Sequence, residues 1–77
     1  MLLSITEQVG CRIKCLRSQL GLSQEKLALK ADLDRTYLAG VESGKRNVTI
    51  SSLEKIVIAL DCSMKDFFDF EKDVDYK

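Results

Sequence analysis

The sequence predicts an all-α domain of five short helices, and three observations carry this prediction. The chain has 77 residues with no proline and four glycines, so few positions in it oppose helix formation. Its apolar residues recur at steps of three and four, which is the spacing of one face of an α-helix. Residues that cap helix N-termini precede most of these apolar runs, namely Ser23, Asp34, Thr49 and Ser63. A chain of this length forms one domain, so residues 1–77 are expected to fold together.

The first two expected helices lie on either side of Gly21. Residues 4–20 form an amphipathic helix whose apolar face carries Ile5, Val9, Ile13, Leu16 and Leu20. Gly21 is expected to end this helix in the left-handed conformation that glycine adopts easily. Ser23 then caps a second helix, whose core-facing side chains are Leu27, Ala28 and Ala31.

Three further helices are expected after the second. Asp34 caps a third helix over residues 35–42, which is followed by a basic loop at 45–47. Thr49 caps a fourth helix, whose inward face carries Ile50, Leu53, Ile56, Val57 and Leu60. Ser63 caps a short fifth helix with Met64, Phe67 and Phe68, and the charged end EKDVDYK is expected to fray.

The charges are unevenly distributed, although the formal net charge is zero. Residues 1–47 carry eight Lys or Arg and five acidic residues, a net charge of +3. Residues 48–77 carry four lysines and seven acidic residues, a net charge of −3. A basic first part can face the phosphates of a nucleic acid while the acidic part faces away.

The composition argues against an enzyme, a metal site and a membrane protein. Without histidine, the chain lacks the commonest general base and the commonest metal ligand. Structural zinc takes four Cys or His ligands, and this chain offers three cysteines. We therefore expect no metal, no cofactor and no small-molecule substrate. The longest apolar run, residues 56–60, is too short to span a bilayer, and the start MLLSITEQ lacks the features of a secretory leader, so a cytoplasmic location is expected.

The segment at residues 23–42 has the organisation of a helix-turn-helix. Two short helices are joined by a turn of about three residues, and the small Ala28 is placed where the helices cross. Leu27, Leu33, Leu38 and Val41 fill the angle between them. The second helix of such a unit projects polar side chains into the DNA major groove. The sequence therefore predicts a DNA-binding domain.

Two segments resemble a known family. GLSQEKLA at residues 21–28 and VESGKRN at 41–47 resemble the helix-turn-helix domain of the Cro and lambda-type phage repressors, over roughly residues 9–68. Within that family, LDRTYLAGVESGKRN looks most like the controller proteins of restriction–modification systems. The resemblance implies a compact five-helix, lambda-repressor-like domain that binds DNA as a homodimer and regulates its own promoter. Antitoxins and small phage repressors share much of this pattern and stay as alternatives, as does a protein–protein adaptor without DNA binding.

Three positions depart from the family pattern. Asp32 stands in the turn where relatives often carry glycine, and aspartate tolerates the left-handed conformation better than most residues. Ala39 and Gly40 stand where relatives often carry longer polar side chains. This leaves fewer groups that could read bases.

The strongest candidates for base contacts open the third helix. Arg35 is expected to bind guanine through O6 and N7, a contact worth about 1–3 kcal/mol of discrimination. Thr36 can touch a thymine methyl group, a base edge or a phosphate. Tyr37 either donates its hydroxyl to a phosphate or covers the helix junction. By helical phase, Ala39 and Ser43 face the groove with a methyl group and a hydroxyl.

Phosphate contacts are expected on both sides of the third helix. Ser23 and Gln24 stand at a helix N-terminus, which attracts anions, and the resemblance implies that Gln24 holds a phosphate. The resemblance also implies backbone contacts by the basic loop, at Lys45, Arg46 and Asn47. The alternatives are that Ser23 and Gln24 only cap the helix and that the loop is solvated.

Five further residues are expected to support the fold and the assembly. The resemblance implies a structural ion pair between Arg17 and Glu42. The C-terminal helices, over about residues 49–70, are expected to form the dimer interface through Ile58, Phe67 and Phe68, because an exposed apolar patch on a small domain usually marks a partner surface. The alternative is that Phe67 and Phe68 both cover the core of the monomer.

Overall fold

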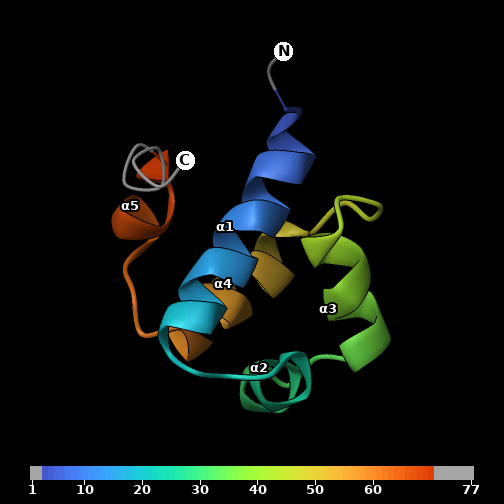
Figure 1. Cartoon of the computed structure of the whole chain (residues 1–77), viewed down its shortest axis with the longest axis vertical. Helices are drawn as coiled ribbons and strands as arrows, with labels where there is room; N and C mark the ends of the chain where they lie inside the picture. Colours follow the sequence, from blue (N-terminus) through green and yellow to red (C-terminus); the bar gives the residue numbers. More distant parts are fainter. Residues whose placement is uncertain (1–2, 71–77) are drawn as a thin grey trace.

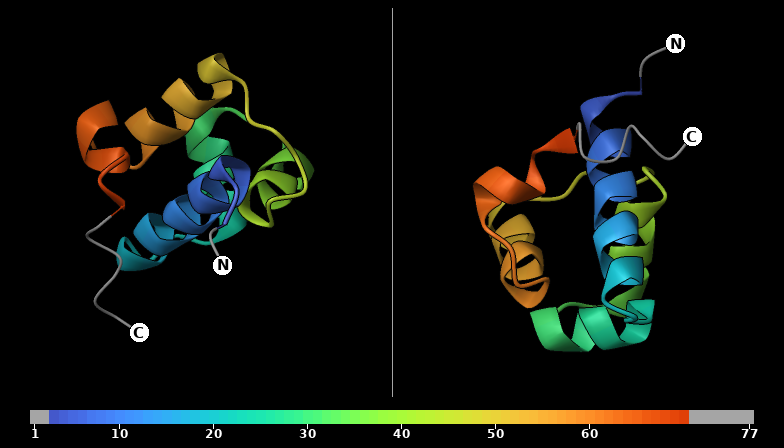
Figure 2. Two further views of the ribbon diagram at one scale, coloured as in Figure 1. Left: turned by 90° about the horizontal axis from the view of Figure 1, so that it is seen from above. Right: turned by 60° about the vertical axis from the view of Figure 1, so that its left-hand side comes forward.

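The computed structural model describes residues 3–70, and within them the chain forms five α-helices and no strand. The helices are α1 (Ile5–Gln19), α2 (Gln24–Ala31), α3 (Arg35–Glu42), α4 (Ile50–Ala59) and α5 (Met64–Phe67). α1 packs along α3, and α2 lies across the ends of α3 and α4 (Figures 1 and 2). α5 and α3 lie on opposite sides of α1 (Figure 1). The prediction of an all-α fold is confirmed, and the end EKDVDYK lies outside the described residues.

The expected capping residues determine where the helices begin. The side-chain oxygens of Ser23, Asp34, Thr49 and Ser63 each accept a hydrogen bond of 3.0–3.1 Å from a backbone N–H three residues further on. α1 begins in the same way, with a reciprocal capping box between Ser4 and Glu7. Each of these bonds satisfies a backbone donor that the first turn of a helix cannot pair.

Left-handed residues connect the helices. Gly21 has a φ of 71° after α1, and Asp32 has a φ of 57° at the end of α2, as the sequence predicts. The second connection is the turn of the helix-turn-helix, in which Leu33 N donates to Ala28 O at 2.8 Å. Aspartate therefore adopts the left-handed conformation that this turn requires.

The core lies where the five helices meet. Its fully buried side chains include Ile13, Leu27, Leu38, Val41, Ile56 and Phe67. Three residues that were expected on inward faces are exposed instead: Ile5 by 60%, Leu20 by 47% and Ile50 by 86%. Ile5 and Ile50 are the first residues of α1 and α4, and Leu20 follows the last residue of α1. At the ends of a helix, the repeating pattern of apolar residues extends beyond the part of the helix that neighbouring helices cover.

Phe67 is a core residue, which corrects its expected place in the dimer interface. Its side chain is fully buried, whereas Phe68 is 41% exposed and packs edge-on against it, with ring centroids 5.1 Å apart. Phe67 is the last residue of the four-residue α5 and Phe68 is its C-cap, so the end of this single helical turn buries one ring and leaves its neighbour partly exposed. Ile58, which is 67% exposed, and Phe68 are the predicted interface residues that the fold leaves accessible.

Arg12 holds α5 against α1, and sequence reasoning missed this role. Its side chain is 2% exposed. Its Nε donates to Phe67 O and its Nη2 donates to Asp66 O, both at 2.7 Å. These carbonyls end α5, where a positive charge is favourable. The spacing of the sequence could have indicated that Arg12 is buried, because it stands three residues after Val9 and four before Leu16 on the buried side of α1.

Candidate nucleic-acid interface

The first turn of α3 presents polar side chains to solvent while its other face is anchored in the core. Arg35 and Thr36 are exposed, and Leu38 and Val41 are buried. α3 is also held closely against α1, because a Cβ at Gly10 would lie 2.4 Å from Val41 O. α3, the expected recognition helix of the helix-turn-helix, is thus firmly seated, and the residues expected to contact bases lie at its exposed start.

Tyr37 connects the start of α3 to the start of α4. Its hydroxyl accepts a hydrogen bond of 3.3 Å from Thr49 N. Partial burial raises the pKa of Tyr37, but interactions with Ser52 and Thr49 and the charge of Arg46 outweigh it, so the pKa lies below its ordinary value. Tyr37 therefore covers the junction of α3 and α4. The hydrogen bond that its hydroxyl is expected to donate to a phosphate stays a prediction.

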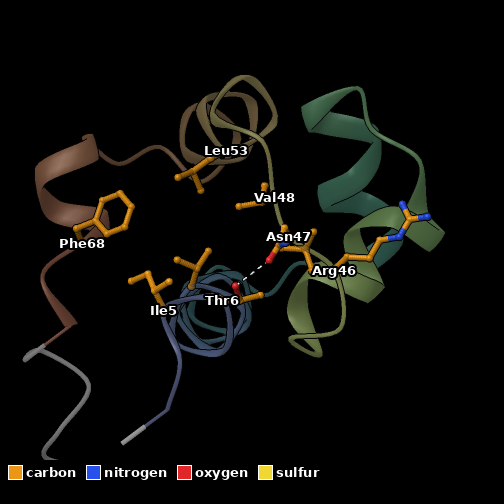
Figure 3. Close-up of a pocket in the computed structure, with 9 residues that line it drawn as sticks. Ile5, Thr6, Arg46, Asn47, Val48, Leu53 and Phe68 are labelled. Carbon is orange, nitrogen blue, oxygen red and sulfur yellow. Dashed lines mark hydrogen bonds between the residues drawn. The ribbon is translucent and has the colours of Figure 1, made fainter.

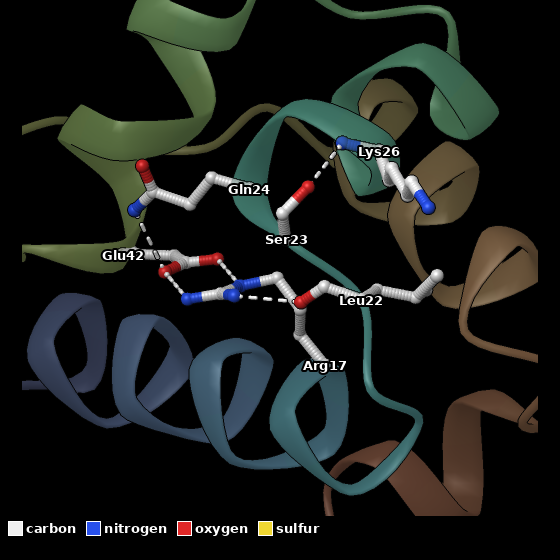
Figure 4. A network of polar contacts seen from close by, with 6 residues as sticks. All are labelled: Arg17, Leu22, Ser23, Gln24, Lys26 and Glu42. Carbon is white, nitrogen blue, oxygen red and sulfur yellow. Dashed lines mark hydrogen bonds and ion pairs between the residues drawn. The ribbon is translucent and has the colours of Figure 1, made fainter.

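Arg17 and Glu42 form a largely buried ion pair at the end of α3 (Figure 4). Arg17 Nε lies 2.8 Å from Glu42 Oε2, and Nη2 lies 3.0 Å from Oε1, so the pair is bidentate. Arg17 Nη1 also donates to Leu22 O at 2.8 Å. The pair therefore connects α1, α3 and the segment that leads into α2.

Gln24 belongs to the same network. Its Nε2 donates to Glu42 Oε1 at 3.0 Å, which fixes the amide at the start of α2 (Figure 4). A glutamine amide carries two hydrogens, so a second one is available for an anion. Ser23 Oγ meanwhile accepts from Lys26 N and caps the helix. The expected phosphate contacts of both residues stay predictions, although the structure places them together at one helix N-terminus.

The basic loop after α3 folds back onto that helix. The backbone N–H groups of Lys45 and Arg46 both donate to Gly40 O, at 3.0 and 3.1 Å. The Ser43 hydroxyl donates to the same carbonyl at 3.0 Å, so its hydrogen is used within the helix end. Lys45 and Arg46 themselves are exposed. The loop thus stands beside the recognition helix, as the sequence predicts.

Asn47 is held by α1, a contact that the sequence does not reveal. Asn47 Oδ1 accepts a hydrogen bond of 3.0 Å from Thr6 Oγ1 (Figure 3). The two residues stand at the edge of an apolar groove of about 290 Å³, lined in part by Ile5, Val9, Val48, Leu53 and Phe68. Figure 3 shows the Arg46 side chain extending away from the other residues of this groove.

Most of the predicted DNA-binding residues lie on α3 or in segments that contact it. Ser23 and Gln24 start α2, while Arg35, Thr36, Tyr37 and the half-buried Ala39 lie on α3. The loop at 45–47 adjoins the end of that helix. Ile58 lies apart from these residues on α4, whereas Phe68, directly after α5, lines the same apolar groove as Asn47. Within residues 3–70, no group of three or more His, Cys, Asp or Glu side chains could hold a metal ion, and no helix could cross a membrane.

Comparison with known proteins gives the family. A helix-turn-helix family model matches residues 13–67. Control protein C.MunI of Mycoplasma sp is 46% identical over 66 residues, which are 83% of this chain and 89% of that protein. Control protein C.BamHI of Bacillus amyloliquefaciens is 45% identical over 62 residues, 79% of this chain and 76% of that protein.

A solved structure agrees with these relatives. The restriction–modification controller protein C.Esp1396I, as a tetramer in complex with its natural 35 base-pair operator, superimposes with a TM-score of 0.84. It is 42% identical, and the match covers 92% of this chain and 95% of that chain. On the sequence and the fold together, the chain belongs to the helix-turn-helix family and, within it, to the controller proteins of restriction–modification systems.

Proposed function

We propose that this protein is a cytoplasmic, sequence-specific transcriptional regulator that binds the promoter of its own gene as a dimer. The observation that carries the proposal is the exposed polar start of α3, where Arg35 and Thr36 stand on a helix whose opposite face is buried. An α-helix of this kind fits the major groove of B-DNA. The operator complex of the related C.Esp1396I supports the same interpretation.

In this proposal the polar residues have two different tasks. Arg35 and Thr36 read base edges, and Ala39 offers a methyl group to a thymine. Ser23, Gln24 and the basic loop hold phosphates on either side of the helix, and Tyr37 is a further candidate for a phosphate contact. Ser43 supports the loop by donating a hydrogen bond to Gly40 O, the carbonyl that also binds the loop. None of these tasks requires catalysis or a cofactor, so the protein is not an enzyme in this proposal.

Dimerisation supplies the specificity that one domain lacks. Two or three base contacts fall short of the roughly 4–10 kcal/mol by which specific sites usually exceed random DNA. A two-fold dimer would place two α3 helices in successive major grooves, about 34 Å or 10 base pairs apart, on an approximately palindromic operator. The exposed Ile58 and Phe68 are the proposed contacts between the two copies.

Charge separation explains how a neutral chain could bind DNA. The basic residues are concentrated in the first 47 positions, which contain α2, α3 and the loop, whereas the net charge of the later residues is −3. The acidic part would face away from the phosphates.

Two observations would separate the alternative functions. A protein–protein adaptor of the same fold would not change the electrophoretic mobility of the DNA upstream of its own gene. An endonuclease gene next to the gene of this protein would indicate a controller protein and not an antitoxin or a phage repressor.

Arg35→Ala is expected to weaken specific binding by about 1–3 kcal/mol and to relax base choice at one position in each half-site. Titrations with specific and with random DNA at the same ionic strength would measure both effects. Lys45→Ala is the matched control, because loss of a phosphate contact weakens binding to all sequences and lowers the salt slope by about one. Equal losses on both DNAs would mean that Arg35 holds only phosphate.

A further inference from the structure

Gly40 occupies an unusual position in the recognition helix. Glycine in a helix interior costs stability relative to alanine, and Gly40 is not among the residues with a positive φ. The reason for a small residue here is space. A Cβ built on Gly40 would lie 3.0 Å from Arg46 Cγ and 3.1 Å from Arg46 Cδ. The aliphatic part of Arg46 therefore lies directly over Gly40.

Three contacts with Gly40 and Tyr37 hold Arg46 in this place. Its backbone N–H donates to Gly40 O at 3.1 Å, and its side chain crosses the bare backbone of the same residue. Its guanidinium carbon lies 5.5 Å from the centroid of the Tyr37 ring, which is within the range of a cation–π interaction. The Tyr37 ring is itself fixed, because its hydroxyl accepts a hydrogen bond from Thr49 N.

We propose that Gly40 and Tyr37 are positioning residues that order Arg46 against α3 before DNA arrives. The inference rests on the proposed function, in which Arg46 contacts the DNA backbone. A free arginine side chain loses rotamer freedom when it is immobilised on a phosphate. An Arg46 already held across Gly40 and Tyr37 has lost part of that freedom in the unbound protein. The missing side chain at position 40 thus contributes to affinity by making room for the loop arginine.

A double-mutant cycle with Gly40→Leu and Arg46→Ala tests this proposal. Gly40→Leu is expected to displace Arg46 and to lower affinity for operator DNA by up to about tenfold, the scale of one arginine's rotamer freedom. In the Arg46→Ala background the same change is expected to alter affinity by less than about twofold. The unbound protein should be at least as heat-stable as wild type, since leucine is the better helix former. Equal losses in both backgrounds would overturn the proposal, because they would indicate a direct clash of the introduced leucine with DNA.

A second measurement needs no DNA. In the unbound protein, the Arg46 δ protons should show a ring-current shift from Tyr37 in NMR spectra, and this shift should disappear in both Gly40→Leu and Tyr37→Leu. An unshifted Arg46 in the wild-type protein would overturn the positioning role itself. A shifted Arg46 in a wild-type protein that fails to bind DNA would instead contradict the proposed function, so the two failures are distinguishable.

Discussion

Phe68→Glu is expected to give a folded monomer that binds specific DNA at least about 100-fold more weakly than the wild-type protein, because a dimer's specificity over random DNA typically exceeds that factor. Phe68 is 41% exposed and is not one of the buried core residues, although its ring packs against Phe67, so this variant is expected to fold. A carboxylate at this position would be desolvated between the two copies, which is strongly unfavourable. Sedimentation would report the oligomeric state, and titration of a two-half-site DNA would report affinity.

Leu29→Glu provides the matched control for Phe68. Leu29 is 81% exposed on α2, and the same change of charge there does not touch the proposed dimer contacts. This variant is expected to remain dimeric. A Phe68→Glu protein that still sedimented as a dimer would remove Phe68 from the interface and direct attention to Ile58.

Glu42→Ala is expected to lower the free energy of unfolding by about 3 kcal/mol or more, because it leaves the charge of Arg17 largely buried without its partner. The Glu42 side chain is 3% exposed and that of Arg17 13%. The same change also removes the acceptor of the Gln24 amide. Urea denaturation monitored by circular dichroism would measure the loss.

The ion pair between Lys30 and Asp61 is a suitable comparison. Its atoms are 3.7 Å apart and its side chains are 48% and 76% exposed. Lys30→Ala is therefore expected to cost less than about 1 kcal/mol. Similar losses for the two variants would contradict the view that burial makes the Arg17–Glu42 pair important.

Local chemistry made much of this fold predictable from the sequence. Ser23 and Thr49 each precede a run of helix-forming residues and cap the helix that begins there. Asp32 preserves the turn because aspartate tolerates the left-handed conformation. These features depend on residues within a few positions of one another. The recognition helix also followed from spacing, because Leu38 and Val41 determine which side of α3 faces outward.

The features that the sequence did not predict depend on distant segments. Arg12 reaches carbonyls 54 and 55 positions away, and Thr6 meets Asn47 at a separation of 41. The same limit explains the error at Phe67, because α5 is too short for a periodic pattern to separate a buried ring from an exposed one. The place of Arg46 over Gly40 likewise depends on how the loop closes, which no periodicity records.

Selection from a pool of random double-stranded DNA would test the proposed DNA-binding function most directly. The purified wild-type protein should enrich an approximately palindromic sequence whose half-sites are centred about 10 base pairs apart. The enriched DNA should be bound about 10³-fold or more tightly than random DNA at the same salt concentration. No enrichment, or enrichment of a single unpaired half-site by a monomer, would contradict the account of a dimer that reads DNA with Arg35 and Thr36 of two α3 helices.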